Sequence, residues 1–180
     1  MSCFTVALLL ALGVAAFGQT TRPTLNDLKT AIETTQKIWV TFRSYERGLN
    51  GQLNTCLYVE TVKREAPRYE FEQYFKQGET RMQEHLFGEV SIGHHGEPTL
   101  TIKNDKASQG LQYTMRYWHP DSHCAILTFR NQQEGQEECE MHVWNNNLED
   151  QSLGLHLCEL ELDKLCGGRK YQTYLPQCKA

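Results

Sequence analysis

The sequence predicts an all-β fold, and three observations lead to that prediction. Short runs rich in β-branched and aromatic residues recur over residues 38–144. Turns rich in Gly, Pro, Asn and Asp separate these runs at close spacing. A clear helical period occurs only afterwards, over residues 155–165. Eight closely spaced strands joined by short turns are typical of an up-and-down barrel or a sandwich.

The chain begins with an apolar segment of the kind that directs secretion. Residues 1–18 carry no charged side chain, and the apolar run from Phe4 to Leu12 is too short to span a bilayer. Ala16-Phe17-Gly18 is a small-x-small pattern, so we expect a signal peptide that is cleaved after Gly18. Residues 19–180 then have the length of one domain, with no further run of transmembrane length.

A short helix is expected before the strands. Thr24 or Asn26 would cap it, and Leu28, Ile32 and Gln36 follow four residues apart on one face. The apolar period then changes from helical to strand-like. We expect strands over residues 38–45, 56–65, 69–77, 80–92, 99–102, 111–118, 124–130 and 138–144.

Alternation along these segments indicates strands with one buried face. In residues 69–77, aromatic side chains at Tyr69, Phe71 and Phe75 alternate with charged ones, which is the pattern of a half-buried strand. The last element is a helix over residues 155–165, which Gly167-Gly168 would end.

The cysteines indicate an oxidising compartment. The chain has seven, and Cys3 would leave with the signal peptide. Six remain, at positions 56, 124, 139, 158, 166 and 178. Six cysteines allow about fifteen pairings, so spacing alone does not choose among them. No pair has CxxC spacing and no histidines stand at zinc-finger spacing, so neither a metal nor another cofactor is expected.

Charge and motifs favour binding over catalysis. The formal net charge of −4 and the scattered Lys and Arg argue against nucleic acid as a partner. The sequence has no GxSxG, phosphate-loop or HExxH motif, and disulfides would leave no thiol nucleophile. His94 and His95 lie in a turn-rich loop and are interpreted as solvated side chains.

The C-terminal part carries a more specific signal. Its elements are the strand Cys139-Glu140-Met141-His142-Val143, followed by Cys158, Cys166, Gly168-Arg169, Tyr174 and Cys178. In this joint spacing the chain resembles the tick salivary lipocalins of the histamine-binding-protein family, in the calycin superfamily. The resemblance covers nearly all of the mature chain. It implies an eight-stranded antiparallel up-and-down lipocalin barrel with a short N-terminal helix and a C-terminal α-helix, present as a monomer.

The resemblance also implies a disulfide framework. It suggests that Cys56 pairs with Cys178 and that Cys124 pairs with Cys158, which leaves Cys139 with Cys166. The first bridge would tie the second strand to the tail, and the second would hold the helix to the barrel wall.

Alternate residues of a barrel strand point inward, and an eight-stranded barrel admits one small ligand. Trp39 is expected at the barrel floor, as in the first strand of lipocalins, and Thr41 on the same inward face. The predicted ligand-contacting residues are Trp39, Arg43, Tyr45, Tyr69, Phe71, Phe75, Tyr113, Met115, Tyr117, Glu140, His142 and Trp144. For each aromatic residue, plain core packing is an equally good interpretation.

The expected ligand is a lipid rather than an amine. Amine-binding relatives resemble one another in an acidic residue directly after a cysteine, but Ala125 follows Cys124 here. Glu140 keeps the second carboxylate, whereas His142 stands where those relatives have an aromatic residue. Arg43 would receive the carboxylate of a fatty-acid-derived mediator, or else would pair with Glu140.

The resemblance therefore implies a secreted salivary protein that sequesters a small hydrophobic host molecule, such as a sterol or a fatty-acid-derived mediator, and so modulates host inflammation and immunity. One alternative is a carrier of a biogenic amine such as histamine or serotonin. Another is a scaffold whose loops at residues 93–98 and 104–110, expected at the open end of the barrel, bind a host immune protein.

Overall fold

The computed structural model describes residues 22–132, 134–148 and 153–179; the expected signal peptide and its cleavage after Gly18 lie outside the described residues. The helices and strands are, in chain order, α1 (Leu25–Ile32), β1 (Ile38–Arg43), β2 (Gly48–Leu49), β3 (Gln52–Glu65), β4 (Arg68–Gln77), β5 (Thr80–Ile92), β6 (Pro98–Lys103), β7 (Leu111–His119), β8 (Cys124–Arg130), β9 (Glu137–Trp144), the 3-10 helix η1 (Asn145–Asn147), α2 (Leu153–Cys166), β10 (Tyr171–Gln172) and the 3-10 helix η2 (Pro176–Lys179).

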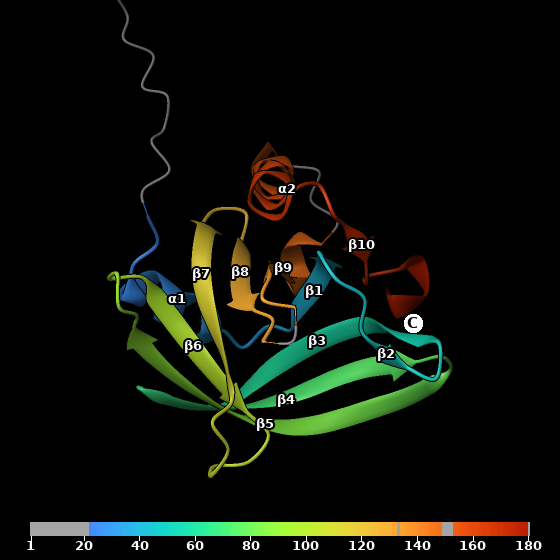
Figure 1. Cartoon of the computed structure of the whole chain (residues 1–180), viewed down its shortest axis with the longest axis horizontal. Coiled ribbons are helices and arrows are strands. Elements are labelled where there is room, and N and C mark those ends of the chain that lie inside the picture. The colour runs from blue at the N-terminus through green and yellow to red at the C-terminus, as the bar shows by residue number, and fades with distance from the viewer. Residues whose placement is uncertain (1–21, 133, 149–152, 180) are drawn as a thin grey trace, which may run out of the picture.

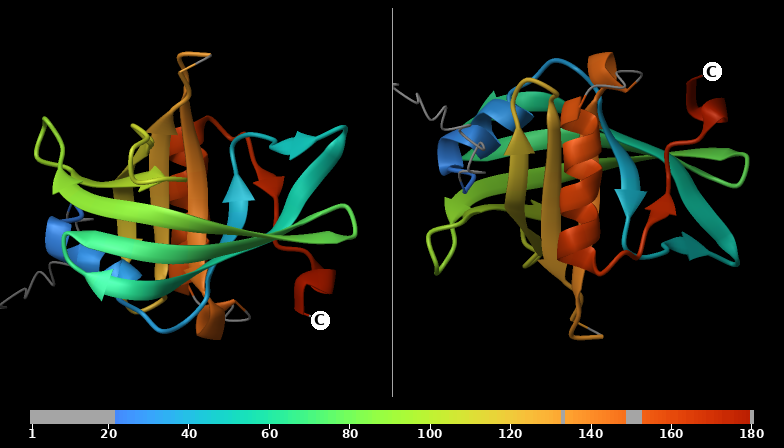
Figure 2. Two further views of the ribbon diagram at one scale, coloured as in Figure 1. Left: turned by 90° about the horizontal axis from the view of Figure 1, so that it is seen from below. Right: turned by 90° about the horizontal axis from the view of Figure 1, so that it is seen from above.

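The long strands form a closed antiparallel barrel. From β3 to β9 each strand pairs with the next one along the chain, and β1 pairs with both β9 and β3. The short strands β2 and β10 add to the edges of β3 and β1. Figures 1 and 2 show this barrel with α1 at one end and α2 along its outer side. The predicted eight-stranded barrel with a helix before and after it is confirmed.

Two boundaries differ from the sequence-based expectation by four residues, and the other differences are smaller. α1 ends at Ile32 rather than at Gln36, because the chain turns there and the Gln36 amide donates to the hydroxyl of Thr34. Thr24 rather than Asn26 is the N-cap, in a capping box with Asp27. β3 begins at Gln52, four residues before Cys56, because this end of the strand pairs with β2 on one side and the end of β4 on the other.

Register shifts occur in β1, β3 and β7, and those in β1 and β7 change which predicted residues face the interior. The register of β1 against β9 shifts between Val40 and Phe42, and that of β7 against β8 shifts between Met115 and Tyr117. A bulge places two consecutive residues opposite one, so the inward and outward faces exchange beyond it. Strict alternation along β1 and β7 therefore fails after these points.

Apolar side chains pack on both sides of the barrel wall. Inside, α1 contributes Leu28 and Ile32, which pack with Val90 and Leu100 of β5 and β6. Outside, α2 buries Leu162 against β7, β8 and β9. Each helix thus buries one face, and α1 closes the end of the barrel where it sits (Figure 2).

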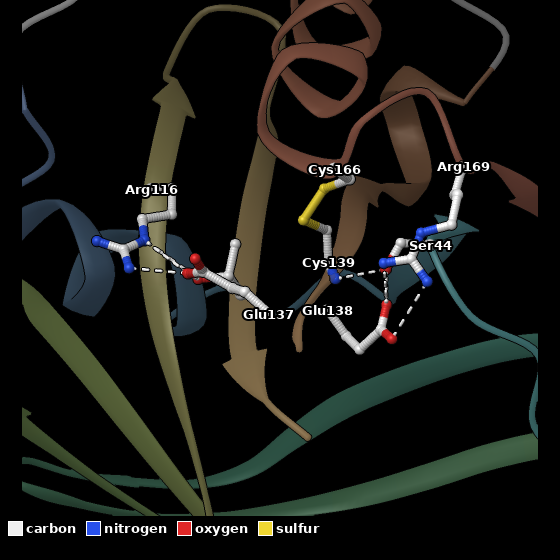
Figure 3. Close-up of a disulfide and its surroundings, with 8 residues drawn as sticks. Ser44, Arg116, Glu137, Glu138, Cys139, Cys166 and Arg169 are labelled. Carbon is white, nitrogen blue, oxygen red and sulfur yellow. Dashed lines mark hydrogen bonds and ion pairs between the residues drawn. A yellow bond between two sulfur atoms is a disulfide. The ribbon is translucent and has the colours of Figure 1, made fainter. Parts of the chain in front are cut away.

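Two disulfides hold α2 to the wall, and they join the pairs that the resemblance implies. Cys158 is bonded to Cys124 of β8, and Cys166 to Cys139 of β9. Beside the second bridge, the buried carboxylate of Glu138 accepts from the Ser44 hydroxyl and lies 3.3 Å from the Arg169 guanidinium, measured from Oε2 to Nη2 (Figure 3). The end of α2 is therefore anchored covalently and, just beyond it, through an ion pair between the buried Glu138 carboxylate and the exposed Arg169.

The C-terminal tail returns to the start of the barrel. Cys178 is bonded to Cys56 across a sequence separation of 122 residues. Before it, Gln172 of β10 pairs with Phe42, and the Thr173 hydroxyl donates to the carbonyl of Val40. The tail thereby covers the outer side of β1 and the adjoining part of β3.

Candidate functional site

The barrel contains a small cavity that begins beneath α1 and extends to a group of charged side chains. Its volume is about 90 Å³. The wall is mainly aliphatic, formed by residues such as Leu28, Ile32, Val40, Leu57, Leu100 and Leu127. Such a space suits a small apolar group.

Seven of the twelve residues predicted to contact a ligand line this cavity. They are Arg43, Phe71, Tyr113, Met115, Glu140, His142 and Trp144. Three of them lie on β9. The register shift between β1 and β9 falls in β1, and β9 pairs with β8 without a shift. Simple alternation therefore places the β9 side chains on the inward face.

The charged group at the cavity is an ion pair with polar neighbours. Nε of Arg43 lies 3.1 Å from Oε1 of Glu140, and the two residues are 3% and 4% exposed. The Tyr45 hydroxyl donates to the same carboxylate, and Nε2 of His142 lies 3.2 Å from its Oε2. Nη1 of Arg43 is buried and has no hydrogen-bond partner among the described residues.

The pair is ionised at neutral pH. Burial opposes the charge on Glu140, but Arg43 and then His142 and Tyr45 stabilise it and lower the pKa of the carboxyl to about 2. Burial also opposes the charge on Arg43, yet Glu140 raises the pKa of the guanidinium. Burial, together with the nearby Glu140 charge, raises the pKa of both Tyr45 and Tyr113. Both phenols are therefore neutral hydrogen-bond donors.

Three other predicted residues lie near the cavity without lining it. Tyr45 is part of the charged group and stacks its ring 5.2 Å from the Arg43 guanidinium. Tyr69 packs at the α1 end, where its hydroxyl donates to Glu33 at 2.7 Å. Phe75 packs against Val40 and Leu57.

The expectation that Trp39, Thr41 and Tyr117 face inward is wrong. Trp39 lies on the outer side of β1, where its indole donates to Asn145 at 3.0 Å, so it does not fill the barrel floor. Thr41 follows the bulge at Val40 and donates to the carbonyl of Met141.

In β7 the bulge after Met115 turns Tyr117 outward, into the cluster beneath α2. The same bulge turns Trp118 toward the inner cluster. Trp118 packs against Trp144, with ring centroids 5.1 Å apart, near Leu28 of α1. These two indoles, rather than Trp39, pack at the α1 end of the barrel.

Sequence reasoning missed two polar residues of the cavity wall. Gln73 lies between Phe71 and Phe75 in the same alternation, so the β4 pattern contained the signal for it. Arg47 follows β1 in a loop and reaches the cavity from the end opposite α1. No strand period extends to Arg47.

The two loops proposed to share the open end lie at opposite ends of the barrel. Residues 93–97 connect β5 to β6 and residues 104–110 connect β6 to β7, and successive turns of an antiparallel meander alternate ends (Figure 1). They do not form one surface.

Among the described residues, no three His, Cys, Asp or Glu side chains are grouped to hold a metal ion, and no helix is long and apolar enough to cross a membrane.

Comparison with known proteins identifies the family. A sequence model described as tick histamine binding protein matches residues 19–180. The chain belongs to the tick histamine-binding protein family. No curated protein matches the chain significantly.

Two solved structures illustrate the likeness of this family member to other barrels. A structure described as a complex of AM182 with serotonin aligns with a TM-score of 0.60 at 15% identity, covering 90% of this chain and 95% of AM182. Japanin from Rhipicephalus appendiculatus, bound to cholesterol, aligns with a TM-score of 0.53 at 12% identity, covering 79% and 93%. At such identities the likeness concerns the fold.

Proposed function

We propose that this protein is a secreted salivary carrier that holds a small hydrophobic host-derived molecule in its barrel and so modulates host inflammation and immunity. Membership of the histamine-binding family and the three disulfides support this proposal. The observation that carries it is a largely apolar cavity inside the barrel, into which the buried Arg43 presents an unpartnered donor. Buried donors in a purely structural interior are nearly always hydrogen-bonded, so the unpartnered Nη1 supports a role in ligand binding.

The unpartnered donor favours an acidic lipid over a neutral one. Nη1 of Arg43 would donate to the carboxylate of a fatty-acid-derived ligand, whose chain would contact the aliphatic wall. A sterol offers only a hydroxyl to the same donor, and a hydrogen bond between a charged and a neutral group is weaker. We therefore rank a fatty-acid-derived mediator above a sterol.

The size of the cavity sets a condition on this ligand. Pockets for drug-sized ligands measure roughly 300–1,000 Å³, whereas this one measures about 90 Å³. A lipid would have to move side chains of the wall, so we expect binding to be accompanied by opening of the barrel interior. A short acyl chain would need less opening than a long one.

A biogenic amine is the second candidate, because Glu140 lies inside a small cavity beside His142 and Tyr45, and because AM182 has been crystallised with serotonin. Arg43 counts against it, since this guanidinium already neutralises the carboxylate and would repel an ammonium at close range.

Charge-deleting variants separate the two candidates. Any bound ligand is first removed by solvent extraction, and native mass spectrometry verifies its removal. Calorimetry then measures the binding of medium-chain fatty acids, serotonin and histamine. If the ligand is an acid, Arg43→Gln weakens fatty-acid binding by roughly 10- to 100-fold, the value of one charged hydrogen bond. Glu140→Gln leaves acid binding in place. Arg116→Gln, on the outer surface, is the matched control.

The opposite pattern would identify an amine carrier: binding of serotonin that Glu140→Gln abolishes and that Arg43→Gln strengthens by freeing the carboxylate. An extracted protein that binds neither class would overturn the proposal. The pH dependence of fatty-acid binding is a further test. Glu140 stays ionised down to about pH 2, whereas a free fatty acid protonates at roughly pH 4–5. Acid binding should therefore weaken below that pH while the internal ion pair persists.

A further inference from the structure

A second and larger depression lies outside the barrel, and we call it the outer groove. It runs between the outer face of β3, β4 and β5 on one side and η1 with the C-terminal tail on the other, and its volume is about 810 Å³. Its lining includes the aromatic residues Trp39, Tyr58, Tyr74 and Tyr174 and the cations Lys37, Lys76, Arg81 and Lys179. None of the described residues that line it is an aspartate or a glutamate.

The aromatic residues form a continuous row. Tyr58 lies 4.7 Å from Trp39 and 4.9 Å from Tyr74 between ring centroids, and the two tyrosine rings are nearly parallel, 20° apart. Tyr174 of the tail packs edge-on against Trp39, whose indole is fixed by Asn145. Tyr58 and Tyr74 are half-buried, and Tyr74 is the last ring of the row, with Tyr58 as its one aromatic contact among the described residues. Such rings are suited to stacking against a planar ligand.

Two of the cations stand directly opposite each other. Lys76 of β4 and Arg81 of β5 are cross-strand partners, and neither forms an ion pair with any described residue. Like charges in this position repel, so the protein loses stability by keeping both. Lys37 adds a third cation, with its ammonium 4.4 Å from the centre of the Tyr58 ring. This arrangement would be relieved by a bound anion.

The strand register fixes how the rings and the cations are spaced. Tyr58 pairs with Tyr74, and Lys76 lies two residues further along β4, which corresponds to about 7 Å. On the other side of the tyrosines, the cross-strand pair Glu60 and Glu72 carries negative charge. The charge on this face therefore changes sign along the strands, with carboxylates on one side of the tyrosine pair and cations on the other side, at the groove.

We propose that the outer groove binds a nucleoside phosphate. The planar base would stack on Tyr74, the ring at the end of the row, and the phosphate would lie between Lys76 and Arg81, where the guanidinium can donate two parallel hydrogen bonds. Glu60 and Glu72 would exclude the reverse orientation by repulsion. Because the groove lies outside the barrel, this site is independent of the lipid carrier function.

Titration with ADP tests the proposal, with adenosine and inorganic pyrophosphate as partial ligands. We expect saturable calorimetric binding of ADP that weakens as salt rises, and weaker binding of each partial ligand. Lys76→Gln/Arg81→Gln should weaken ADP binding more than about tenfold, as expected for lost charged hydrogen bonds. Tyr74→Leu should weaken it by roughly fivefold or more, the value of one stacked base.

The matched control is Lys106→Gln/Arg130→Gln, which removes two exposed cations outside the groove and should leave ADP binding unchanged. Thermal unfolding of each variant verifies the fold. The proposal is overturned if ADP does not bind, if pyrophosphate binds as tightly as ADP, or if Lys76→Gln/Arg81→Gln binds ADP normally. Loss of ADP binding in Arg43→Gln would also overturn it, since that result would place the nucleotide inside the barrel.

Discussion

The barrel cavity and the outer groove both bring cations next to aromatic rings, but they compensate the charge differently. Inside, Arg43 is 3% exposed and lies 3.1 Å from Glu140, with Tyr45 and His142 completing the group. Outside, Lys76 and Arg81 face each other without an ion pair among the described residues.

The difference follows from the cost of removing charge from water. A buried charge must be paired, because the energy lost by desolvation is several kcal/mol per ion. On the surface, water and salt screen the repulsion between two cations, so the fold tolerates it. The cavity can therefore select a ligand only through the unpartnered Nη1 of Arg43, whereas the groove can select one through its net positive charge.

Breaking the internal pair should have the largest effect. Glu140→Gln leaves Arg43 buried without its counterion, so we expect the free energy of unfolding to fall by about 3–5 kcal/mol. Chemical denaturation at neutral pH measures this change. The double variant Arg43→Met/Glu140→Met removes both charges and should recover most of the loss. A Glu140→Gln protein as stable as the wild type would mean that the pair is solvated.

A pair of tryptophan variants tests which side of the wall each ring occupies. Trp39→Phe removes the hydrogen bond to Asn145 and should lower the free energy of unfolding by about 1 kcal/mol without changing the affinity for a cavity ligand. Trp144→Phe changes the cavity wall itself and should alter that affinity. Equal effects of the two variants on cavity binding would contradict the outward position of Trp39.

The surface repulsion should give the smallest effect, with the opposite sign. Lys76→Gln/Arg81→Gln removes like charges from opposing positions, so at low salt the free energy of unfolding should rise by about 0.2–1 kcal/mol. The gain should vanish at high salt as screening increases. A loss of stability at low salt would show that these side chains make compensating contacts in the free protein.

The sequence was informative about strands because each buried face repeats every second residue. Along β9, Glu140, His142 and Trp144 all line the cavity as that period predicts. The period failed in β1 and β7, because each contains a bulge that no residue in the sequence marks. Trp39 and Tyr117 were therefore assigned to the wrong side of the wall.

The sites were less predictable than the strands. The sequence left two partners open for Arg43, a ligand carboxylate or Glu140. The choice between them depends on the register between β1 and β9. The volume of the cavity depends on side-chain packing and has no sequence signature. The outer groove gathers residues from β1, β3, the β4–β5 hairpin, η1 and the tail, so only the opposed Lys76 and Arg81, close to the Gly78 turn, could have been anticipated.

The bond between Cys56 and Cys178 affects the two sites differently. The pairing that closes the barrel, from β3 around to β1, involves no residue of the tail. Cys178 and Tyr174, in contrast, form part of the groove wall, and this disulfide fastens them there. Reduction of this one bond would therefore loosen a wall of the groove while leaving the strand pairing around the cavity in place.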